Sequence, residues 1–589
     1  MRLGFAVAAS FTVLVAITGC GPSSGGGSHG DVLSIEVSPP NATLTWTGAP
    51  LSQSYTATAT YEDGTTGVLT DVVFNLDQDG VKLGAFTAAD FAVSGQAAGK
   101  GGVFAKSGEV TGSTSMIVVL HPVRVGPGVP ADGADKFPDV SPVGATSPTV
   151  VYPLDRALMP TSVKSPNVQW EGPAAVNDLF RVRLTAGFAT VDTIVANAPG
   201  FTLSSQLSPS DWQLLVNSAG GDEITVAVDH WDPANGAAGG APVGVKMIRG
   251  DITGAIYYWN LGAGRMERID TAGRALAIQN PPPRPDNGAR CVACHSVSKD
   301  GRYLSGSLWG GGEQGAVFDM SNPSVLTADP APTLAPLSMT TYTQLFSTFN
   351  HDATRLMVNV GNALTLLDPR NGAAVPTNGA PLPATGAAHP SWSPDGTTVA
   401  YISNHNGPWA VDYTAGDLSV FSATTTGDSF GASTTLVTSA AAGAGFAAPS
   451  WPTFSPDSQW IAYGAGVNSR GRNDGVPAVY PGSLFVINKA GGTSHRLDVA
   501  CAGARNCYLP NFSPYDTGEH IWLVFYSLRD YGNALAGSKG TGRRQMWITA
   551  IDKSKLGTSD ASSVPYWVPD QDVATENMSA FWAPPPPIQ

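Results

Sequence analysis

The sequence predicts an all-β protein with two N-terminal sandwich domains followed by six repeated small sheets. Two observations carry this prediction. Short runs of alternating apolar and polar residues, separated by turn residues, fill the first part of the chain, which is typical of half-buried strands. A Ser-Pro-Asp motif followed by an apolar strand recurs through the second part, which indicates a repeat architecture. With 589 residues, the chain is long enough for several domains.

The composition favours a folded, turn-rich protein that does not bind nucleic acid. Hydrophobic residues make up 42% of the chain, enough for packed cores, whereas charged residues make up only 13%. The net charge is −14, and Arg543-Arg544 is the only adjacent pair of basic residues. Because a nucleic-acid surface needs a basic stripe, this class of partner is excluded.

The N-terminus has the pattern of an export signal. The apolar run Phe5–Ile17 is too short to span a bilayer and has the size of a signal-peptide core. It leads into Ala16-Ile17-Thr18-Gly19-Cys20, which resembles the lipobox of bacterial lipoproteins. The resemblance implies a signal peptide over residues 1–19, a lipid on Cys20 and a Gly/Ser tether over residues 20–30. It also implies an outer-membrane lipoprotein that faces the periplasm or the cell surface and meets the membrane through its lipid anchor only. The alternative is an ordinary signal peptide with a chance cysteine.

Residues 31–121 alternate over short runs such as Leu33–Val37, Tyr55–Ala59 and Met116–Leu120. This pattern predicts a β-sandwich, and the segment resembles a bacterial immunoglobulin-like domain. Residues 122–149 are rich in Pro, Gly and Ala, which predicts a linker.

Residues 150–253 form a second β segment. Strands are expected at Asn167–Trp170, Phe180–Leu184 and Ile224–Val228. Their order resembles a fibronectin type III-like sandwich.

The rest of the chain repeats. Clear copies start at His389-Pro-Ser-Trp-Ser-Pro-Asp-Gly396, Pro452-Thr-Phe-Ser-Pro-Asp457 and Pro510-Asn-Phe-Ser-Pro514, and weaker ones at His295, Ser347 and Ala580. Alignment superposes the apolar residues 297, 349, 392, 454, 512 and 582. The repeat resembles that of TolB-type propellers, which implies a six-bladed β-propeller over residues 254–589.

The last copy has no chain left to complete its sheet. The runs Ala255–Trp259 and Arg265–Ile269 look like a hairpin that lacks an inner strand. We therefore expect Ser579–Ala583 to pair with this hairpin and close the ring, which hides two sheet edges. An open sheet and a seven-bladed ring are the alternatives.

One motif carries strong chemical information: Cys291-Val-Ala-Cys294-His295. Two thiols at this spacing can bond both vinyl groups of one haem, and the next residue can ligate the iron. The motif resembles that of c-type cytochromes, which implies haem c bound covalently to Cys291 and Cys294 with His295 as proximal ligand. A Cys291–Cys294 disulfide and another metal site are the alternatives.

Candidates for the second axial ligand are His389, which the repeat alignment places at the position of Cys294, and Met578, just before the closing strand. Met339 and His351 are weaker candidates, and an open position is the remaining option. Cys501 and Cys507 enclose a short loop, and in an oxidising compartment they are expected to form a disulfide.

The segment from Gly254 through the haem motif resembles envelope lipoproteins of myxobacteria and related bacteria, a resemblance that implies the architecture and no activity. The expected role is electron transfer, or redox or ligand sensing, with a redox partner or another envelope protein. The alternative is a non-enzymatic scaffold that binds an envelope protein or polymer, in which Cys291–Cys294 is a structural disulfide or the haem is structural. No catalytic residue is predicted, and the sequence leaves open whether the protein is an enzyme.

Overall fold

The computed structural model describes residues 30–139, 141–248, 252–310, 312, 314–337, 342–443, 445–470, 482–503 and 506–587, and it is mostly β. These residues form two compact units. The first consists of residues up to Thr43 with Leu51–Val93 and Lys100–Ile117, and the second holds the rest. No helix among the described residues is long and apolar enough to cross a membrane. The predicted signal peptide and Cys20 lie outside the described residues.

The first unit is built from short antiparallel strands. Its strands and helix are β1 (Val32–Ser38), β3 (Ser52–Ser54), β4 (Thr56–Tyr61), β5 (Thr66–Val68), β6 (Val73–Leu76), α1 (Gly80–Leu83), β7 (Gly84–Thr87), β8 (Asp90–Val93), and most of β9 (Gly99–Ser107) and β10 (Val110–Leu120). Alternate residues of β4 are buried, as the sequence pattern predicts. Tyr55, Phe74, Phe86 and Phe91 form an aromatic core with ring centroids 5.4–6.4 Å apart. The predicted strands are present, and the immunoglobulin-like assignment stays a prediction.

The second unit begins with a sheet around β15 and β18. Its elements before the ring are β2 (Ala42–Trp46), β11 (Val123–Val125), η1 (Ala134–Lys136), β12 (Thr149–Tyr152), β13 (Ala157–Pro160), β14 (Asn167–Glu171), β15 (Leu179–Ala186), β16 (Ala189–Ala196), β17 (Ser204–Gln206), α2 (Pro209–Ala219), β18 (Glu223–Asp232), β19 (Gly236–Gly239) and β20 (Val243–Ile248). The three expected strands lie within β14, β15 and β18. The fibronectin-like assignment stays a prediction.

Two features of this region differ from the sequence prediction. The expected linker contains β11, which pairs in parallel with β16. The chain also has a helix, α2, so it is mostly β rather than all-β. Ser208 caps this helix by accepting a hydrogen bond from the Asp211 amide, Pro209 starts it, and Gly220 ends it in the left-handed conformation.

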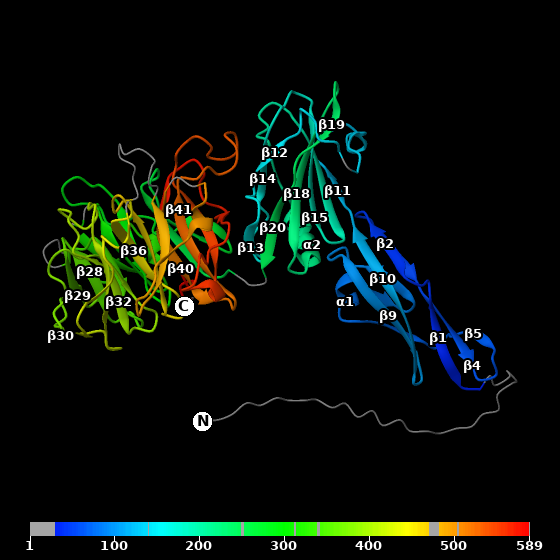
Figure 1. The fold of residues 1–589 in the computed structure, drawn as a ribbon, viewed down its shortest axis with the longest axis horizontal. Helices are drawn as coiled ribbons and strands as arrows, with labels where there is room; N and C mark the ends of the chain where they lie inside the picture. The colour runs from blue at the N-terminus through cyan, green and yellow to red at the C-terminus, as the bar shows by residue number, and fades with distance from the viewer. Residues whose placement is uncertain are drawn as a thin grey trace. The chain divides into compact units, whose positions relative to one another are not determined.

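Six small antiparallel sheets make up the remainder of the described chain (Figure 1, green to red). In order from the innermost strand they are β44 (Asn577–Ala583), β21 (Ala255–Asn260), β22 (Arg265–Asp270), β23 (Gly273–Leu276); β24 (Val292–Val297), β25 (Tyr303–Leu308), β26 (Gln314–Asp319); β27 (Phe346–Phe349), β28 (Leu356–Val360), β29 (Ala363–Leu367); β31 (Ala388–Trp392), β32 (Thr398–Ser403), β33 (Asp417–Ser422), β35 (Thr434–Val437); β36 (Ala448–Phe454), β37 (Trp460–Gly466), β38 (Ser483–Asn488), β39 (His495–Arg496); and β40 (Cys507–Asp516), β41 (His520–Ser527), β42 (Gln545–Asp552), β43 (Tyr566–Trp567). The smaller elements between them are α3 (Ser324–Thr327), β30 (Asn378–Gly379), β34 (Ser429–Phe430), α4 (Asp498–Cys501) and η2 (Lys553–Lys555).

The six innermost strands contact one another in a closed cycle, β24–β27–β31–β36–β40–β44 and back to β24. This is the arrangement of a β-propeller. The last strand closes the ring as predicted, because β44 pairs antiparallel with β21 from Ala255↔Ala583 to Asn260↔Asn577. Apolar residues between neighbouring sheets, such as Trp392 and Leu304, are fully buried and form the core.

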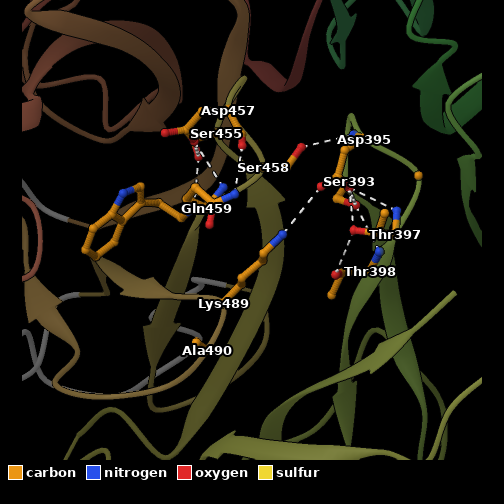
Figure 2. A network of polar contacts seen from close by, with 12 residues as sticks. Ser393, Asp395, Thr397, Thr398, Ser455, Asp457, Ser458, Gln459, Lys489 and Ala490 are labelled. Carbon is orange, nitrogen blue, oxygen red and sulfur yellow. Dashed lines mark hydrogen bonds and ion pairs between the residues drawn. The ribbon is translucent and has the colours of Figure 1, made fainter.

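The repeated Ser-Pro-Asp motif forms one turn, drawn in Figure 2 for two neighbouring sheets. The Ser393 hydroxyl donates to Asp395 at 2.5 Å and accepts from the Thr398 amide at 3.0 Å, and Asp395 accepts from the Thr397 amide at 2.9 Å. Ser455 and Asp457 repeat these bonds with the amides of Trp460 and Gln459. The two turns are joined where the Asp395 amide donates to the Ser458 hydroxyl. The motif therefore recurs because it fixes the turn that leads out of the innermost strand in these two sheets.

Acid should weaken this turn. Burial raises the pKa of Asp395, but hydrogen bonds from Ser393 and Thr397 outweigh burial and lower it below the ordinary value. A carboxylate with a lowered folded pKa contributes stability above its unfolded pKa and loses it as the pH falls through the folded pKa. We expect Asp395→Asn to cost about 1 kcal/mol at pH 7, at the low end for a charged hydrogen bond because the side chain is 38% exposed.

The measurement is thermal unfolding of wild type and Asp395→Asn as a function of pH. The difference should close as the pH falls below the ordinary Asp pKa of about 3.9 and through the lowered pKa of Asp395 in the folded protein. Asp286→Asn, at an exposed loop residue, is the control and should stay close to wild type. A difference that persists unchanged at pH 2 would contradict the assignment.

Candidate functional site

The innermost strands line a central cavity of about 100 Å³. Each innermost strand contributes residues from the same segment of the repeat. This segment begins three positions before the aligned apolar residue. The residues at the first of these positions are Cys294, Phe346, His389, Trp451, Leu509 and Ser579. The alignment that placed His389 at the position of Cys294 is therefore confirmed.

Five of the six strands bulge at this position. Cys294, His389, Trp451, Leu509 and Ser579 have φ between 48° and 56°, and the strand register shifts there in each case. A left-handed conformation costs a non-glycine residue roughly 1–2 kcal/mol, so a fivefold recurrence indicates that the ring imposes it. Phe346 is the exception among the six.

The cysteine motif lies at this bulge, with Cys294 and His295 in β24 and Cys291 just before it. Both cysteines are half-buried free thiols in the structure. Burial raises the pKa of both, that of Cys294 to about 12 with a further contribution from neighbouring Cys291. In the folded protein the thiols are therefore protonated at neutral pH, and they are poor nucleophiles.

His295 is a neutral imidazole with an unpartnered nitrogen. Burial lowers its pKa to about 4, although its contact with the backbone carbonyl oxygen of Tyr257 opposes the shift. Its Nε2 lies 3.4 Å from that oxygen, and its buried Nδ1 has no hydrogen-bond partner among the described residues. A neutral imidazole with a free nitrogen is the form that ligates metals.

His389 is oriented by Tyr413, a residue that the sequence analysis missed. The Tyr413 hydroxyl lies 2.7 Å from the Pro449 carbonyl oxygen and 3.2 Å from His389 Nδ1. Because the carbonyl can only accept, the hydroxyl gives it its proton and accepts from Nδ1–H. The Trp451 amide also lies 3.4 Å from Nδ1, a contact that would favour the tautomer with the proton on Nε2. The two shorter contacts of the Tyr413 hydroxyl favour the proton on Nδ1 and are given more weight.

This arrangement leaves the lone pair of His389 on Nε2, which is buried and has no partner among the described residues. The ring is 3% exposed and stacks on Trp451 with centroids 4.1 Å apart. Burial lowers its pKa well below the ordinary value, so the ring is neutral. An imidazole held through its other nitrogen is the usual arrangement of a metal ligand.

A second cavity of about 300 Å³ adjoins Cys294 at the mouth of the channel. Its wall is mostly apolar and includes Trp259, Leu261, Phe346, Val411, Trp451, Leu509 and Met578, with the cations Arg470 and Arg544. Arg470 pairs with Asp412 at 3.2 Å and Arg544 pairs with Glu576. Met578 therefore lies at the same end of the channel as Cys294, as expected.

The remaining predicted residues lie apart from this site. His351 follows β27 at the far end of the strand, and Met339 lies outside the described residues. Cys501 and Cys507 are buried free thiols in one hydrophobic cluster, and burial together with a hydrogen bond to Cys507 raises the pKa of Cys501. Their disulfide stays a prediction. Among the described residues, no group of three or more His, Cys, Asp or Glu is placed to hold a metal ion.

No protein-family model matches the sequence, and no curated protein is significantly similar to it. Solved structures show a distant likeness in fold. A putative TolB from Agrobacterium tumefaciens is 16% identical, covering 54% of this chain and 100% of that chain with a TM-score of 0.29. A putative 6-phosphogluconolactonase from Bacteroides fragilis is 13% identical, covering 56% and 96% with a TM-score of 0.23. An ancestral GH74 enzyme is 10% identical, covering 53% and 36% with a TM-score of 0.32.

Proposed function

We propose that this protein is an outer-membrane lipoprotein whose propeller carries a covalent c-type haem for electron transfer or for redox or ligand sensing. Cys291 and Cys294 would hold the haem, and His295 would be its proximal ligand. The observation that carries the proposal is the position of the motif. It lies at the mouth of the channel, next to an apolar cavity and in the same ring as a second unpartnered imidazole.

The residues present fit such a group. The donor set consists of two thiols at the attachment spacing, the neutral imidazole of His295 and, across the channel, Nε2 of His389. The wall is mostly apolar, and the two arginines beside it, which pair with Asp412 and Glu576, could also bind carboxylates of a bound group. A bound haem supplies a one-electron redox couple.

The protein's own residues would tune the site in two ways. Tyr413 fixes the tautomer of His389, so that its free nitrogen stays a lone-pair donor without a proton change. Burial lowers the pKa of both histidines, which keeps them neutral and competent as ligands well into the acid range.

The test is the mass and spectrum of protein produced with a cytochrome c maturation system. We expect the intact mass to exceed that of the lipoprotein by one haem that acid-acetone does not release, with a c-type pyridine haemochrome. Cys291→Ala/Cys294→Ala should lose the colour and keep its β structure. A mass that shows only a loss of two protons at the cysteine pair would contradict the proposal and favour the scaffold function with a structural disulfide.

The second axial ligand is tested by His389→Ala and by Met578→Leu, which keeps the side-chain volume. Loss of the true ligand should change the axial-ligand bands or convert ferric iron to high spin. His389 is the expected ligand, because its Nε2 is unpartnered and its ring is held through Tyr413. If neither variant changes the spectrum, both nominations are wrong.

A further inference from the structure

The far end of the channel holds a lysine that the proposed function does not use. Lys299 lies five residues after Cys294, just beyond β24. The equivalent residues of the other five strands are His351, Pro394, Pro456, Pro514 and Pro584. Of these six residues, Lys299 alone lines the central cavity, and it also lines a cavity of about 110 Å³ at the far end. Its side chain therefore lies between the two cavities.

The channel lacks a counter-ion for this lysine. None of the residues that line the central cavity is Asp or Glu, and both lining histidines are neutral because burial lowers their pKa. No ion pair or side-chain hydrogen bond joins Lys299 to another described residue. Desolvation lowers the pKa of Lys299 to about 8, so the amine is still mostly protonated at neutral pH. Lys299 is half-buried, so an anion that enters the channel would meet an ammonium group that has no counter-ion among the described residues.

The polar ring above Lys299 presents hydrogen-bond donors to the cavity. Thr348 Oγ1 accepts from the Trp392 amide at 3.0 Å, and Thr453 Oγ1 accepts from the Phe512 amide at 3.4 Å. In the same way, Asn511 Oδ1 accepts from the Trp582 amide at 2.7 Å. Each oxygen thus receives a hydrogen bond from the next sheet. Asn511 Nδ2 also donates to Thr453 Oγ1 at 3.5 Å, so the donors left for a ligand are the two Thr hydroxyl protons and the second hydrogen of Asn511 Nδ2.

We propose that the central channel binds a small inorganic oxyanion on the Lys299 ammonium and on the donors of Thr348, Thr453 and Asn511. The cavity of about 100 Å³ has room for an ion of the size of nitrate or sulfate, given that a water molecule takes about 30 Å³ of liquid volume. None of these donors belongs to the proposed haem site, although Cys294, His295 and His389 line the same cavity nearer its other end. Oxyanions are recognised by such combinations of one cation and several fixed donors.

The experiment is isothermal titration of the full chain, purified in detergent, with sodium nitrate and with sodium sulfate at an ionic strength held constant with sodium chloride. We expect saturable binding of one ion per chain for at least one of them. Lys299→Met should weaken it about tenfold or more, and Lys299→Arg should retain it. Lys553→Met, at a surface lysine that pairs with Asp516, is the matched control and should bind like wild type.

Two further measurements distinguish oxyanion binding from an effect of the haem site and from a loss of folding. Protein produced without a cytochrome c maturation system, in which Cys291 and Cys294 stay unmodified, should bind the ion and should lose binding in Lys299→Met, so that failure of the haem assignment leaves this result intact. Without oxyanion, Lys299→Met should unfold at the same temperature as wild type or higher, because it removes a half-buried ammonium group that forms no ion pair with another described residue. If Lys299→Met does not fold, Lys299→Gln takes its place. Absence of saturable binding to wild type, or equal binding to both proteins, overturns the proposal.

Discussion

Ending the chain after Asp572 should unfold the whole propeller rather than its last sheet. The truncation removes β44, the innermost strand of the sheet that β21 to β23 complete. Trp582 is 3% exposed and donates from its indole to the Thr253 carbonyl at 2.9 Å. Loss of one such tryptophan costs about 3–5 kcal/mol, and here two sheet edges open as well. Because the stability of proteins is only about 5–15 kcal/mol, the ring should not persist.

Limited proteolysis and amide hydrogen exchange measure this effect. Peptides from β31 and β32, which belong to one sheet far in sequence from the truncation, should lose protection together with peptides from β21. A chain that ends after Pro584 and keeps β44 is the control and should stay protected. If only β21 to β23 exchange faster in the truncated protein, the ring does not behave as one cooperative structure and the prediction is wrong.

Replacing Arg181 by Met should destabilise the first part of the second unit by about 3–5 kcal/mol. Arg181 on β15 lies directly opposite Asp229 on β18, and their side chains are 4% and 9% exposed. The guanidinium donates from Nε to Asp229 at 2.8 Å and from Nη1 to the Pro138 carbonyl at 2.8 Å. Without it, Asp229 keeps only the Ser141 hydroxyl at 3.2 Å, so a buried carboxylate is left almost unpartnered.

Urea unfolding and hydrogen exchange of peptides from β15 and β18 give the readout. Arg181→Met/Asp229→Leu should regain most of the loss, because an apolar pair replaces both charges. Lys539→Met is the control. It breaks an ion pair between Lys539, which is 46% exposed, and Glu171, which is 37% exposed, and it should cost less than about 1 kcal/mol of stability. A double variant that is no more stable than Arg181→Met would show that the effect comes from packing rather than from the unpaired charge.

The repeat and its closure could be predicted because their signals are local. Each Ser-Pro-Asp turn forms its hydrogen bonds within a few residues, so the same motif can be recognised in two neighbouring sheets. The hairpin before Cys291 visibly lacks a partner strand, and β44 supplies it. By contrast, β11 is three residues long and depends on β16 for its hydrogen bonds. It could not be recognised in a segment whose Pro- and Gly-rich composition is typical of a linker. The helix α2 could have been found from its Ser208-Pro209 start and Gly220 end.

The site was predictable only in part, for the same reason. The cysteine motif is contiguous, and aligning the repeats led to His389. Tyr413 was missed because its contact with His389 joins different positions of the repeat. Trp451 has the position of His389 in the next repeat, so the same alignment could have identified it. Lys299 could have been found by extending the alignment two residues beyond the apolar position, where most other repeats have proline. An alignment does not show which of these side chains lie in the cavity. That depends on the bulge at Cys294 and at the equivalent residues of the other strands.

The strand that closes the ring also sets an order of events during biosynthesis. If the chain is exported N-terminus first and loaded with haem, as we propose, Cys291 and Cys294 emerge well before β44, and until then β21 has no inner partner. Once the ring is shut, both thiols are half-buried and burial has raised their pKa. An attachment enzyme that needs accessible thiols therefore has to act in the interval between emergence and closure. On the proposed function, the length of chain between the motif and β44 would set the time available for haem attachment, and a slower attachment would leave the propeller without haem.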